Sequence, residues 1–524
     1  MQLKEFIAKK LDAKVIRTRR SDRFKEQHTQ VPPKLVRSAG DSSWWVFCLA
    51  VLALKFLLLG LDPLPKLYLG DSISYLETAI SGWMPGQRSF VYGYVIRWTS
   101  LWTGSLTWLL VLQVFLSIVI AIIAAWICRA IFDLPETLSY LFGFLCSIDP
   151  LQLAWERYVM TETFSLFFYA LVMQQSFVYL RSRRMVTLLA IQVLSVITIS
   201  FRMSFLITVQ VMAVALPVIA FFVEPQPIKP AVGQRWRLQL LKRGAFWRHL
   251  AASAATMFLL DQGYQHVNGF LSHREPARLY DTGYFLLAIW APALQPQDAA
   301  DPRLAEIIRH GGEFGLRDIA LRDGQLFSPG FLVDRWRHAE SDPGKSGEIA
   351  TRTALNAFYR DPATVIGLAA KTYFAFWFWS GHSIQKIAKF DLGMGTHLTD
   401  SERANLAKRF HWAAPPESRR QVQTMTTWYY EAASPYFFLV LLSPVVSLAL
   451  LFIARNKAYA SLLFVHTTVL VTSTFLLSLH PDTRFLHPLS FLTLLTLALA
   501  TKALLHRPRR GSRQKTVLTR HSVI

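Results

Sequence analysis

The sequence predicts an all-α, polytopic membrane protein with about ten transmembrane helices. Of its 524 residues, 52% are hydrophobic and only 17% are charged, whereas a soluble domain carries about 25% charged residues. The apolar residues also fall in blocks of about 20, which is the length that a helix needs to cross a bilayer. Together these observations exclude an ordinary soluble enzyme.

Ten apolar blocks with few charges are each close to that length. They cover residues 44–61, 106–127, 137–153, 161–180, 186–201, 203–223, 250–271, 436–454, 458–478 and 487–505. The first seven blocks would form an N-terminal transmembrane module over residues 44–271, which we expect to be catalytic. The last three would form a C-terminal module over residues 436–505.

The charge distribution predicts the topology. Lys and Arg number 56 against 34 Asp and Glu, a net charge of +22 that on a soluble chain would suggest nucleic acid. With the N-terminus inside, about 30 of the basic residues lie in cytoplasmic pieces, including an arm at 1–43 and a tail at 506–524. We therefore attribute the charge to topology, expect no nucleic-acid partner, and place the chain in a bacterial inner membrane with both termini cytoplasmic.

The long segment 272–434 holds 19 basic and 18 acidic residues, the near-neutral balance of an exported segment. We expect a largely helical periplasmic domain there. Within it, the apolar run 365–379 is too short to cross, and crossing would place the Arg-rich tail outside, so it is predicted to be an interfacial helix. The basic, partly apolar segment 229–249 predicts a second helix, lying on anionic headgroups.

The first outer loop, residues 62–105, is too long for a simple turn and is predicted to contain helices. Asp71, between Gly70 and Ser72, stands where one of these helices begins. As an alternative to a functional role, Asp71 could serve only as a helix cap.

Three further outer loops place charged residues at the same membrane face. They contribute Asp149, Glu156, Arg157 and Glu162, then Arg202, and then His480, Asp482, Arg484 and His487. Each has a structural alternative: Glu162 as a cap, Arg202 as a snorkelling side chain, and Asp482 with Arg484 as a turn pair. Their convergence at one depth instead favours a site for a charged lipid headgroup. Guanidinium groups fit phosphate oxygens, and a neighbouring acid can accept a proton from a nucleophile.

Four short stretches within these loops resemble motifs of the bacterial GT-C glycosyltransferases. These polyprenyl-phosphate-sugar-dependent enzymes include the protein O-mannosyltransferase and aminoarabinose (lipid A) transferase families. The stretches are "GDSISY" (70–75), "ERYVMTETFSLFF" (156–168), "SFRMSF" (200–205) and "DTRFLHP" (482–488). The resemblance makes Asp71 the general base, Tyr75 a nearby site residue and Arg484 the holder of the donor phosphate. It also implicates Glu156 and Glu162, while Met203 stands where the family usually has Pro.

The expected reaction is an inverting transfer of a monosaccharide from a polyprenyl-phosphate carrier to a hydroxyl of a lipid, glycan or protein at the outer face. One base suffices for direct displacement. The donor phosphate or sugar would be bound by Arg484, Arg157, Arg202, Arg88, Lys66, Tyr75, Glu156, Glu162 and His487. Because the first loop has no Asp-x-Asp or Glu-x-Asp pair, and Arg and Lys can neutralise a monophosphate, we expect no metal and no other cofactor.

Two other functions remain open. A lipid-linked-sugar flippase or exporter would use the outer charges as part of a path, with polar residues near the bilayer midplane, where Lys55 is the clearest charge deep in a span. An O-antigen ligase or polymerase would instead place its essential residues in the large outer loop, with Arg278, Arg335, Arg337 or His338 as candidates.

Overall fold

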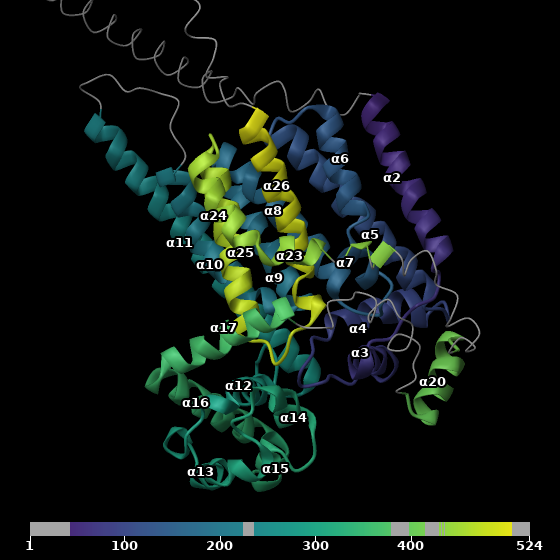
Figure 1. Cartoon of the computed structure of the whole chain (residues 1–524), viewed down its shortest axis with the longest axis vertical. Helices are drawn as coiled ribbons and strands as arrows, with labels where there is room; N and C mark the ends of the chain where they lie inside the picture. Colours follow the sequence, from purple (N-terminus) through teal and green to yellow (C-terminus); the bar gives the residue numbers. More distant parts are fainter. Residues whose placement is uncertain are drawn as a thin grey trace, which may run out of the picture. The chain divides into compact units, whose positions relative to one another are not determined.

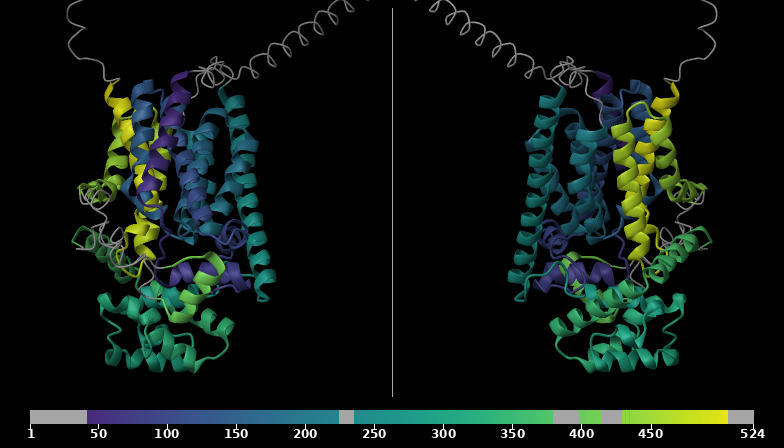
Figure 2. Two further views of the ribbon diagram at one scale, coloured as in Figure 1. Left: turned by 90° about the vertical axis from the view of Figure 1, so that its right-hand side faces the viewer. Right: turned by 90° about the vertical axis from the view of Figure 1, so that its left-hand side faces the viewer.

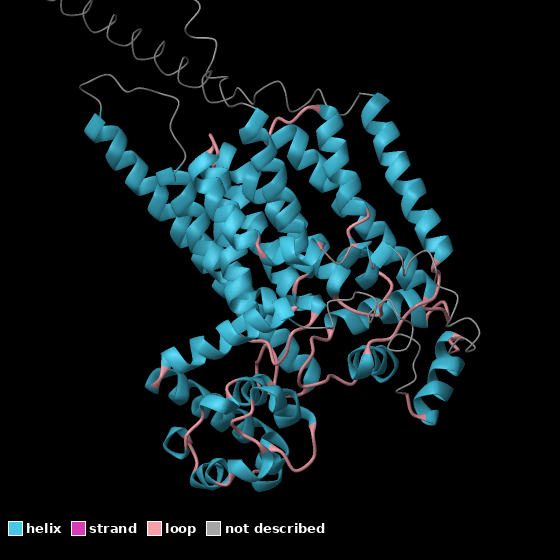
Figure 3. Cartoon of the chain, viewed as in Figure 1, coloured by secondary structure: helices cyan, strands magenta, loops and turns pink. Residues whose placement is uncertain are grey.

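The computed structural model describes residues 42–223, 235–378, 398–413, 429–430, 432–433 and 435–505. In these ranges the regular elements are all helices and there is no strand (Figure 3). The all-α prediction is therefore confirmed for this part of the chain. All but the last two residues of the predicted arm at 1–43, and the whole tail at 506–524, lie outside the described residues.

The chain divides into two units, Met1–Leu54 and Lys55–Ile524. The described part of the first unit is the beginning of helix α2 (Ser42–Leu61). The remaining helices belong to the second unit (Figure 1).

Six segments of the described chain are helical, long and apolar enough to cross a membrane, which indicates a membrane protein. They are α2, Thr107–Ile131, Glu162–Ser182, Met203–Val223, Lys457–Leu476 and His487–Leu505. The last five are built on helices α5 (Thr107–Trp126), α8 (Glu162–Ser182), α10 (Leu206–Val218), α25 (Lys457–Leu476) and α26 (His487–Leu505). They coincide with six of the ten predicted blocks.

Three of the other four blocks are short or broken helices. The block 137–153 is divided between α6 (Glu136–Ser147) and α7 (Pro150–Trp155), because Asp149 caps a new helix that Pro150 begins. Similarly, 436–454 is divided into α23 (Tyr436–Leu441) and α24 (Ser443–Ile453), with Pro444 near the break. The block 186–201 is the 17-residue helix α9 (Met185–Phe201).

The fourth block, 250–271, belongs to α11 (Arg235–Ser272), a helix of 38 residues. The prediction of a separate surface helix over 229–249 is wrong for residues 235–249, because this part continues unbroken into the apolar half. Gly244 is the only potential breaker there, and one glycine costs a helix only about 1 kcal/mol. Residues 224–234 lie outside the described chain.

The long helices of the second unit pack side by side (Figures 1 and 2). Helix α8 lies against α9 and α5, α11 packs on α9 and α10, and α25 contacts α10, α24 and α26. The predicted first outer loop contains two helices, α3 (Leu69–Ser81) and α4 (Val91–Ile96), as expected. Helix α3 ends at Gly82, whose positive φ of 81° suits glycine.

The predicted periplasmic segment is largely helical over its described residues. Its helices are α12 (Thr282–Ile289), α13 (Pro302–Arg309), α14 (Arg322–Phe327), α15 (Leu332–Ala339), α16 (Pro343–Arg360), α17 (Pro362–Phe378) and α20 (Asp400–Phe410). We call residues 280–378 the helical domain. Its core gathers Leu287, Leu304, Trp336 and Ala354 with Leu479 from the loop before α26. The interfacial run predicted at 365–379 lies in α17, with residue 379 outside the described chain.

Close packing of α12 on α16 yields a stability test. A Cβ added at Gly283 would overlap the backbone carbonyl oxygen of Gly347 and lie 2.6 Å from the Thr351 hydroxyl oxygen. Because backbone cannot rotate away as a side chain can, Gly283→Ala should destabilise the helical domain by about 1–3 kcal/mol. Thermal unfolding of the detergent-purified chain measures this. Gly312→Ala is the control, since nothing lies within 4 Å of its Cβ position; equal effects of both changes would contradict the packing argument.

Candidate functional site

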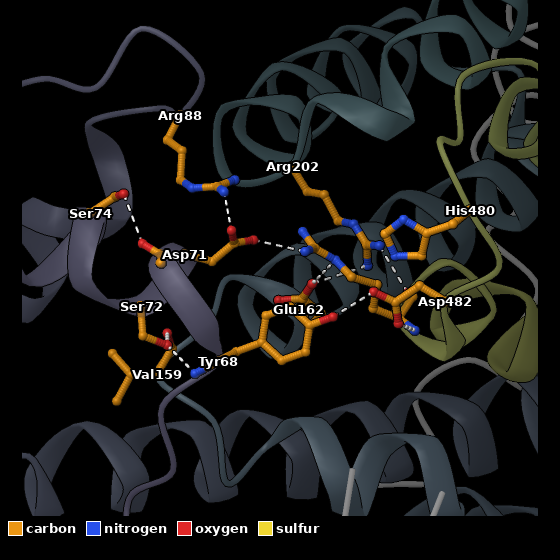
Figure 4. A network of polar contacts seen from close by, with 12 residues as sticks. Tyr68, Asp71, Ser72, Ser74, Arg88, Val159, Glu162, Arg202, His480 and Asp482 are labelled. Atoms are coloured by element: carbon orange, nitrogen blue, oxygen red, sulfur yellow. Dashed lines mark hydrogen bonds and ion pairs between the residues drawn. The ribbon is translucent and has the colours of Figure 1, made fainter. Parts of the chain in front are cut away.

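The Asp71 carboxylate does not cap its own helix. Asp71 lies in the first turn of α3, whose N-cap is Tyr68. The Tyr68 backbone N–H donates to Ser72 Oγ at 2.7 Å, so the serine satisfies the helix start. The cap alternative for Asp71 is therefore wrong, and its carboxylate is directed to other elements (Figure 4).

Two guanidinium groups hold Asp71. Arg88, from the loop between α3 and α4, donates to Asp71 Oδ1, and Arg484 Nη1 donates to Oδ2 at 2.7 Å. The Asp71 side chain is only 15% exposed. Burial alone would raise the pKa of Asp71, but the charges of Arg88 and Arg484 outweigh it and lower that pKa below its usual value.

Glu162 forms the second acidic centre of this cluster. It is the first residue of α8, is fully buried, and its Oε1 lies 3.3 Å from Arg484 Nε and 3.8 Å from Arg202 Nη1. Arg202 is itself only 6% exposed, so its guanidinium does not snorkel to water. We call Asp71, Arg88, Glu162, Arg202 and Arg484 the charged cluster.

Within the charged cluster, several buried polar atoms have no hydrogen-bond partner among the described residues. They are both carboxylate oxygens of Glu162, Arg88 Nε, Arg202 Nη1 and Arg484 Nε. Leaving buried donors and acceptors unmatched is costly, and such atoms are normally satisfied by protein, water or ligand. The cluster thus has donor capacity for a bound anion.

A rigid scaffold holds Arg484. Asp482 Oδ1 accepts the Arg484 backbone N–H at 2.9 Å, and its other oxygen accepts the Tyr68 hydroxyl at 2.8 Å. Arg202 Nη2 also donates to the Arg484 carbonyl oxygen at 2.8 Å. The predicted Asp482–Arg484 turn exists through the backbone, but it leaves the guanidinium to Asp71 and Glu162.

The first outer loop is attached to the segment before α8. Lys66 and Tyr158 form an isolated parallel bridge, in which the Lys66 amide donates to the Arg157 carbonyl and the Val159 amide to the Lys66 carbonyl, each at 2.8 Å. Ser72 Oγ donates to the Val159 carbonyl at 2.9 Å. These bonds fix the start of α3, and so Asp71, beside Glu162.

Three residues predicted to hold the donor, Glu156, Arg157 and Lys66, lie in a separate inner cluster. Lys55 Nζ is 2.6 Å from Glu156 Oε2, and Arg157 Nη2 is 3.5 Å from Glu156 Oε1. Lys66 pairs with Asp62 at 2.7 Å. Glu156 thus pairs with Lys55 and Arg157, and Lys66 with Asp62, whereas the ion-pair partners of Asp71 are Arg88 and Arg484.

The remaining predicted residues are divided between the clusters. Tyr75 is buried, and the Arg88 guanidinium lies 5.8 Å from its ring centroid, so it borders the charged cluster. His487 Nε2 lies 2.6 Å from Gln152 Oε1 and belongs to a buried network with Asp149. Sequence reasoning missed Tyr68, which has no distinguishing signal. It also missed the pairing of Lys55, although a lysine in an apolar helix implies a partner.

The large-loop candidates of a ligase lie apart. Arg278 Nε donates to Asp261 at 2.8 Å, and Arg337 lies 3.5 Å from Asp281. Arg335 covers the Phe314 ring, and His338 pairs with Asp334. Each has a local partner, and no common site emerges from these contacts.

No three His, Cys, Asp or Glu side chains gather as metal ligands would in the described part of the chain. Comparisons of the chain with protein-family models, curated proteins and solved structures find no match. The metal-free site and the GT-C relationship therefore stay predictions.

The inner cluster predicts an asymmetric effect on stability. Glu156→Gln leaves two buried cations, Lys55 and Arg157, without their acid, whereas Lys55→Met leaves Glu156 beside Arg157. Breaking a buried pair costs about 3–5 kcal/mol when a charge is left uncompensated. Glu156→Gln should therefore lower the unfolding temperature in detergent more than Lys55→Met.

Glu306→Gln is the matched control, because Glu306 is more than half exposed and exposed pairs contribute about 0–1 kcal/mol. A larger loss in Lys55→Met than in Glu156→Gln would contradict this balance of buried charges.

Proposed function

We propose that this chain is an inverting membrane glycosyltransferase of the GT-C type, which moves a monosaccharide from a polyprenyl-phosphate carrier to an acceptor hydroxyl. The observation that carries the proposal is the charged cluster, in which an acid is held between guanidinium groups with unsatisfied donors. Arg groups are suited to bind phosphate through paired N–H donors.

The phosphate-binding role rests on Arg484 with Arg88 and Arg202. Their three charges are balanced in the ligand-free cluster by Asp71, Glu162 and the neighbouring Asp482. An anionic phosphate competes for the same donors, since each guanidinium carries five N–H groups in a fixed fork. Arg88 Nε, which has no hydrogen-bond partner among the described residues, provides part of this capacity before any existing pair is broken, whereas Arg202 Nη1 and Arg484 Nε face Glu162.

This competition also accounts for how Asp71 becomes a base. Held by two cations, Asp71 has a lowered pKa and accepts a proton poorly. When a phosphate draws Arg484 and Arg88 toward itself, the carboxylate loses the charges that lowered its pKa while it stays buried. Donor binding therefore raises the basicity of Asp71 just where the acceptor hydroxyl must lose its proton.

The transfer forms one glycosidic bond and breaks another. The acceptor oxygen gives its proton to Asp71 and forms a bond to the anomeric carbon. The bond from that carbon to the phosphate oxygen breaks, and its electron pair leaves with the polyprenyl phosphate. The guanidinium groups stabilise that leaving charge, and loss of such a group typically costs about 10²–10³ in rate.

The proposed topology follows the ten predicted blocks, with the charged cluster at the periplasmic face of a bacterial inner membrane and α17 at the outer surface. Supporting this orientation, the cluster joins the start of α8, the end of α9 and the start of α26, which share one end of the long helices. Donor lipids reside at that interface.

One observation favours the exporter as a second candidate. The Lys55–Glu156 pair is fully buried, and Lys55 belongs to an apolar helix of membrane-spanning length. Ionisable residues inside membrane helices often mark a translocation path. A turnover measurement separates the two functions, because an exporter leaves the glycosidic bond intact.

Replacing Asp71 tests the catalytic assignment. Asp71→Asn keeps the shape of the side chain but removes the base, so turnover should fall by at least about 10²-fold while donor binding persists. Native mass spectrometry of the purified chain, incubated with a panel of polyprenyl-phosphate sugars, measures both quantities. Glu77→Gln on the same helix is the matched control. An active Asp71→Asn protein would refute Asp71 as the base, and bound but uncleaved donor in the wild type would favour the exporter.

Below the bound-state pKa of Asp71, where the enzyme is not competent for transfer, donor binding should be accompanied by proton uptake at this carboxylate. In the free protein its pKa is lowered, and binding is expected to raise it, so the bound state holds more protons between the two pKa values. Affinity should therefore increase as pH falls through the bound-state pKa, and level off below the free-state pKa. Calorimetry in buffers of different ionisation enthalpy counts the protons.

A polyprenyl-phosphate monosaccharide is the appropriate probe, because its phosphodiester does not titrate in this range. Asp71 faces Arg88 and Arg484, with Glu162, Tyr68 and Tyr75 nearby. Asp71→Asn should abolish the uptake. Uptake that survives in this variant would place the proton on another group and contradict the competition model.

A further inference from the structure

The helical domain contacts the loop that carries Arg484. The indole Nε1 of Trp290 donates to the Leu476 carbonyl at 3.1 Å, and Leu479 is buried in the core of the domain. This loop therefore leaves α25, passes through the edge of the helical domain and then reaches the charged cluster.

Arg322 in α14 makes the central contact. It is only 3% exposed, yet within the described residues its bonds go to neutral acceptors: the Ile319 carbonyl at 3.2 Å, the Ser478 carbonyl at 3.3 Å and Thr372 Oγ1 at 2.9 Å. Burial lowers the pKa of Arg322 to about 10. Burying a cation without a neighbouring carboxylate costs free energy. We infer that this cost is offset because the Arg322 bonds hold the loop at Ser478 in place.

The contact extends from Ser478 toward Arg484. Ser478 Oγ donates to the His480 carbonyl at 2.7 Å, and the His480 ring lies 3.6 Å from Asp323, the neighbour of Arg322. Asp482 and Arg484 follow in the short turn Thr483–Phe485. Adjacent residues of α14 thus hold this loop at two points just before the turn.

The same domain, at its start, also holds the loop that carries Arg88. The Gly86 carbonyl accepts the backbone N–H groups of Tyr280 at 2.7 Å and of Asp281 at 3.0 Å. A Cβ added at Gly86 would lie 2.6 Å from Asp281 Oδ1, so a larger residue there requires the Asp281 carboxylate or the loop to move. Arg88 follows two residues later.

We propose that the helical domain fixes the spacing of the two guanidinium groups on either side of Asp71, and that Arg322 is the positioning residue for Arg484. Arg322 contacts neither donor nor acceptor; it acts through Ser478. This inference rests on the proposed function for the identity of the bound group, a lipid phosphate. It gives the helical domain a role in donor binding, in addition to any acceptor recognition.

The test compares Arg322→Gln with Arg317→Gln in the full chain. Arg317 is exposed on the same domain and donates only to the Pro292 carbonyl, at 2.9 Å, so it controls for loss of a surface arginine. Hydrogen exchange of amides 477–486 reports how firmly the loop is held, without any ligand. The affinity for undecaprenyl phosphate, compared with that for undecaprenol, measures how well Arg88 and Arg484 bind the phosphate group.

Arg322→Gln should speed exchange in 477–486 and weaken binding of undecaprenyl phosphate by about tenfold, with undecaprenol binding unchanged. Arg317→Gln should change neither. Unchanged exchange, or faster exchange with unchanged phosphate affinity, would overturn the positioning role.

Gly86→Ala provides an independent variant should Arg322→Gln fail to fold. Its Cβ requires either the Arg88 loop or the Asp281 carboxylate to move, and hydrogen exchange of amides 86–91 shows whether the loop is loosened. A loosened loop should lower phosphate affinity while undecaprenol binding persists. Unchanged phosphate affinity in a folded Gly86→Ala protein with faster exchange in 86–91 would overturn the proposal. If the wild-type chain binds no undecaprenyl phosphate, the proposed function is refuted. Hydrogen exchange of amides 477–486 without ligand would still decide whether Arg322 holds the loop.

Discussion

The contact of Asp71 with Arg88 and Arg484 is the interaction on which the rest of the site depends. A carboxylate buried to this degree is stable as an anion only because cations lie beside it. These cations come from two loops far apart in the sequence, and each loop is held by the helical domain. Removing any one element therefore leaves a buried charge uncompensated, so the cluster acts as a unit.

The ligand-free cluster is balanced but incompletely bonded. Asp71 and Glu162 with Asp482 oppose Arg88, Arg202 and Arg484, while several Nε, Nη and carboxylate atoms have no hydrogen-bond partner among the described residues. A purely structural network would be expected to satisfy these atoms, because each unmatched buried group costs about 1–3 kcal/mol. A site in which an incoming phosphate replaces an internal carboxylate would be expected to contain N–H donors that are not fully hydrogen-bonded before the phosphate binds. The inner cluster also leaves Glu156 Oε1 and Arg157 Nη1 without a hydrogen-bond partner among the described residues, but there the lysine and the acid are closely paired at 2.6 Å.

Hydropathy and charge predicted the helical class and the convergence of Asp71, Glu162, Arg202 and Arg484, because topology sets the depth of each loop. Depth is only one coordinate. Lateral position depends on helix packing, so Glu156, Arg157 and Lys66, which were predicted to lie at the same depth as Asp71, have ion-pair partners of their own. Averaging hydropathy over a window also hides local helix breaks. The predicted span 137–153 therefore included the Asp149–Pro150 helix start as if the helix were continuous. The contact of Arg322 with Ser478 depends on tertiary packing and has no sequence signal.

The most direct measurement is a cryo-electron microscopy structure of the chain with a bound polyprenyl-phosphate monosaccharide. The account predicts that the phosphate lies against Arg484 and Arg88, that the Asp71–Arg484 pair is opened, and that the Asp71 carboxylate faces the anomeric carbon. A phosphate bound at Lys55 and Arg157, with the Asp71–Arg484 contact intact, would contradict it.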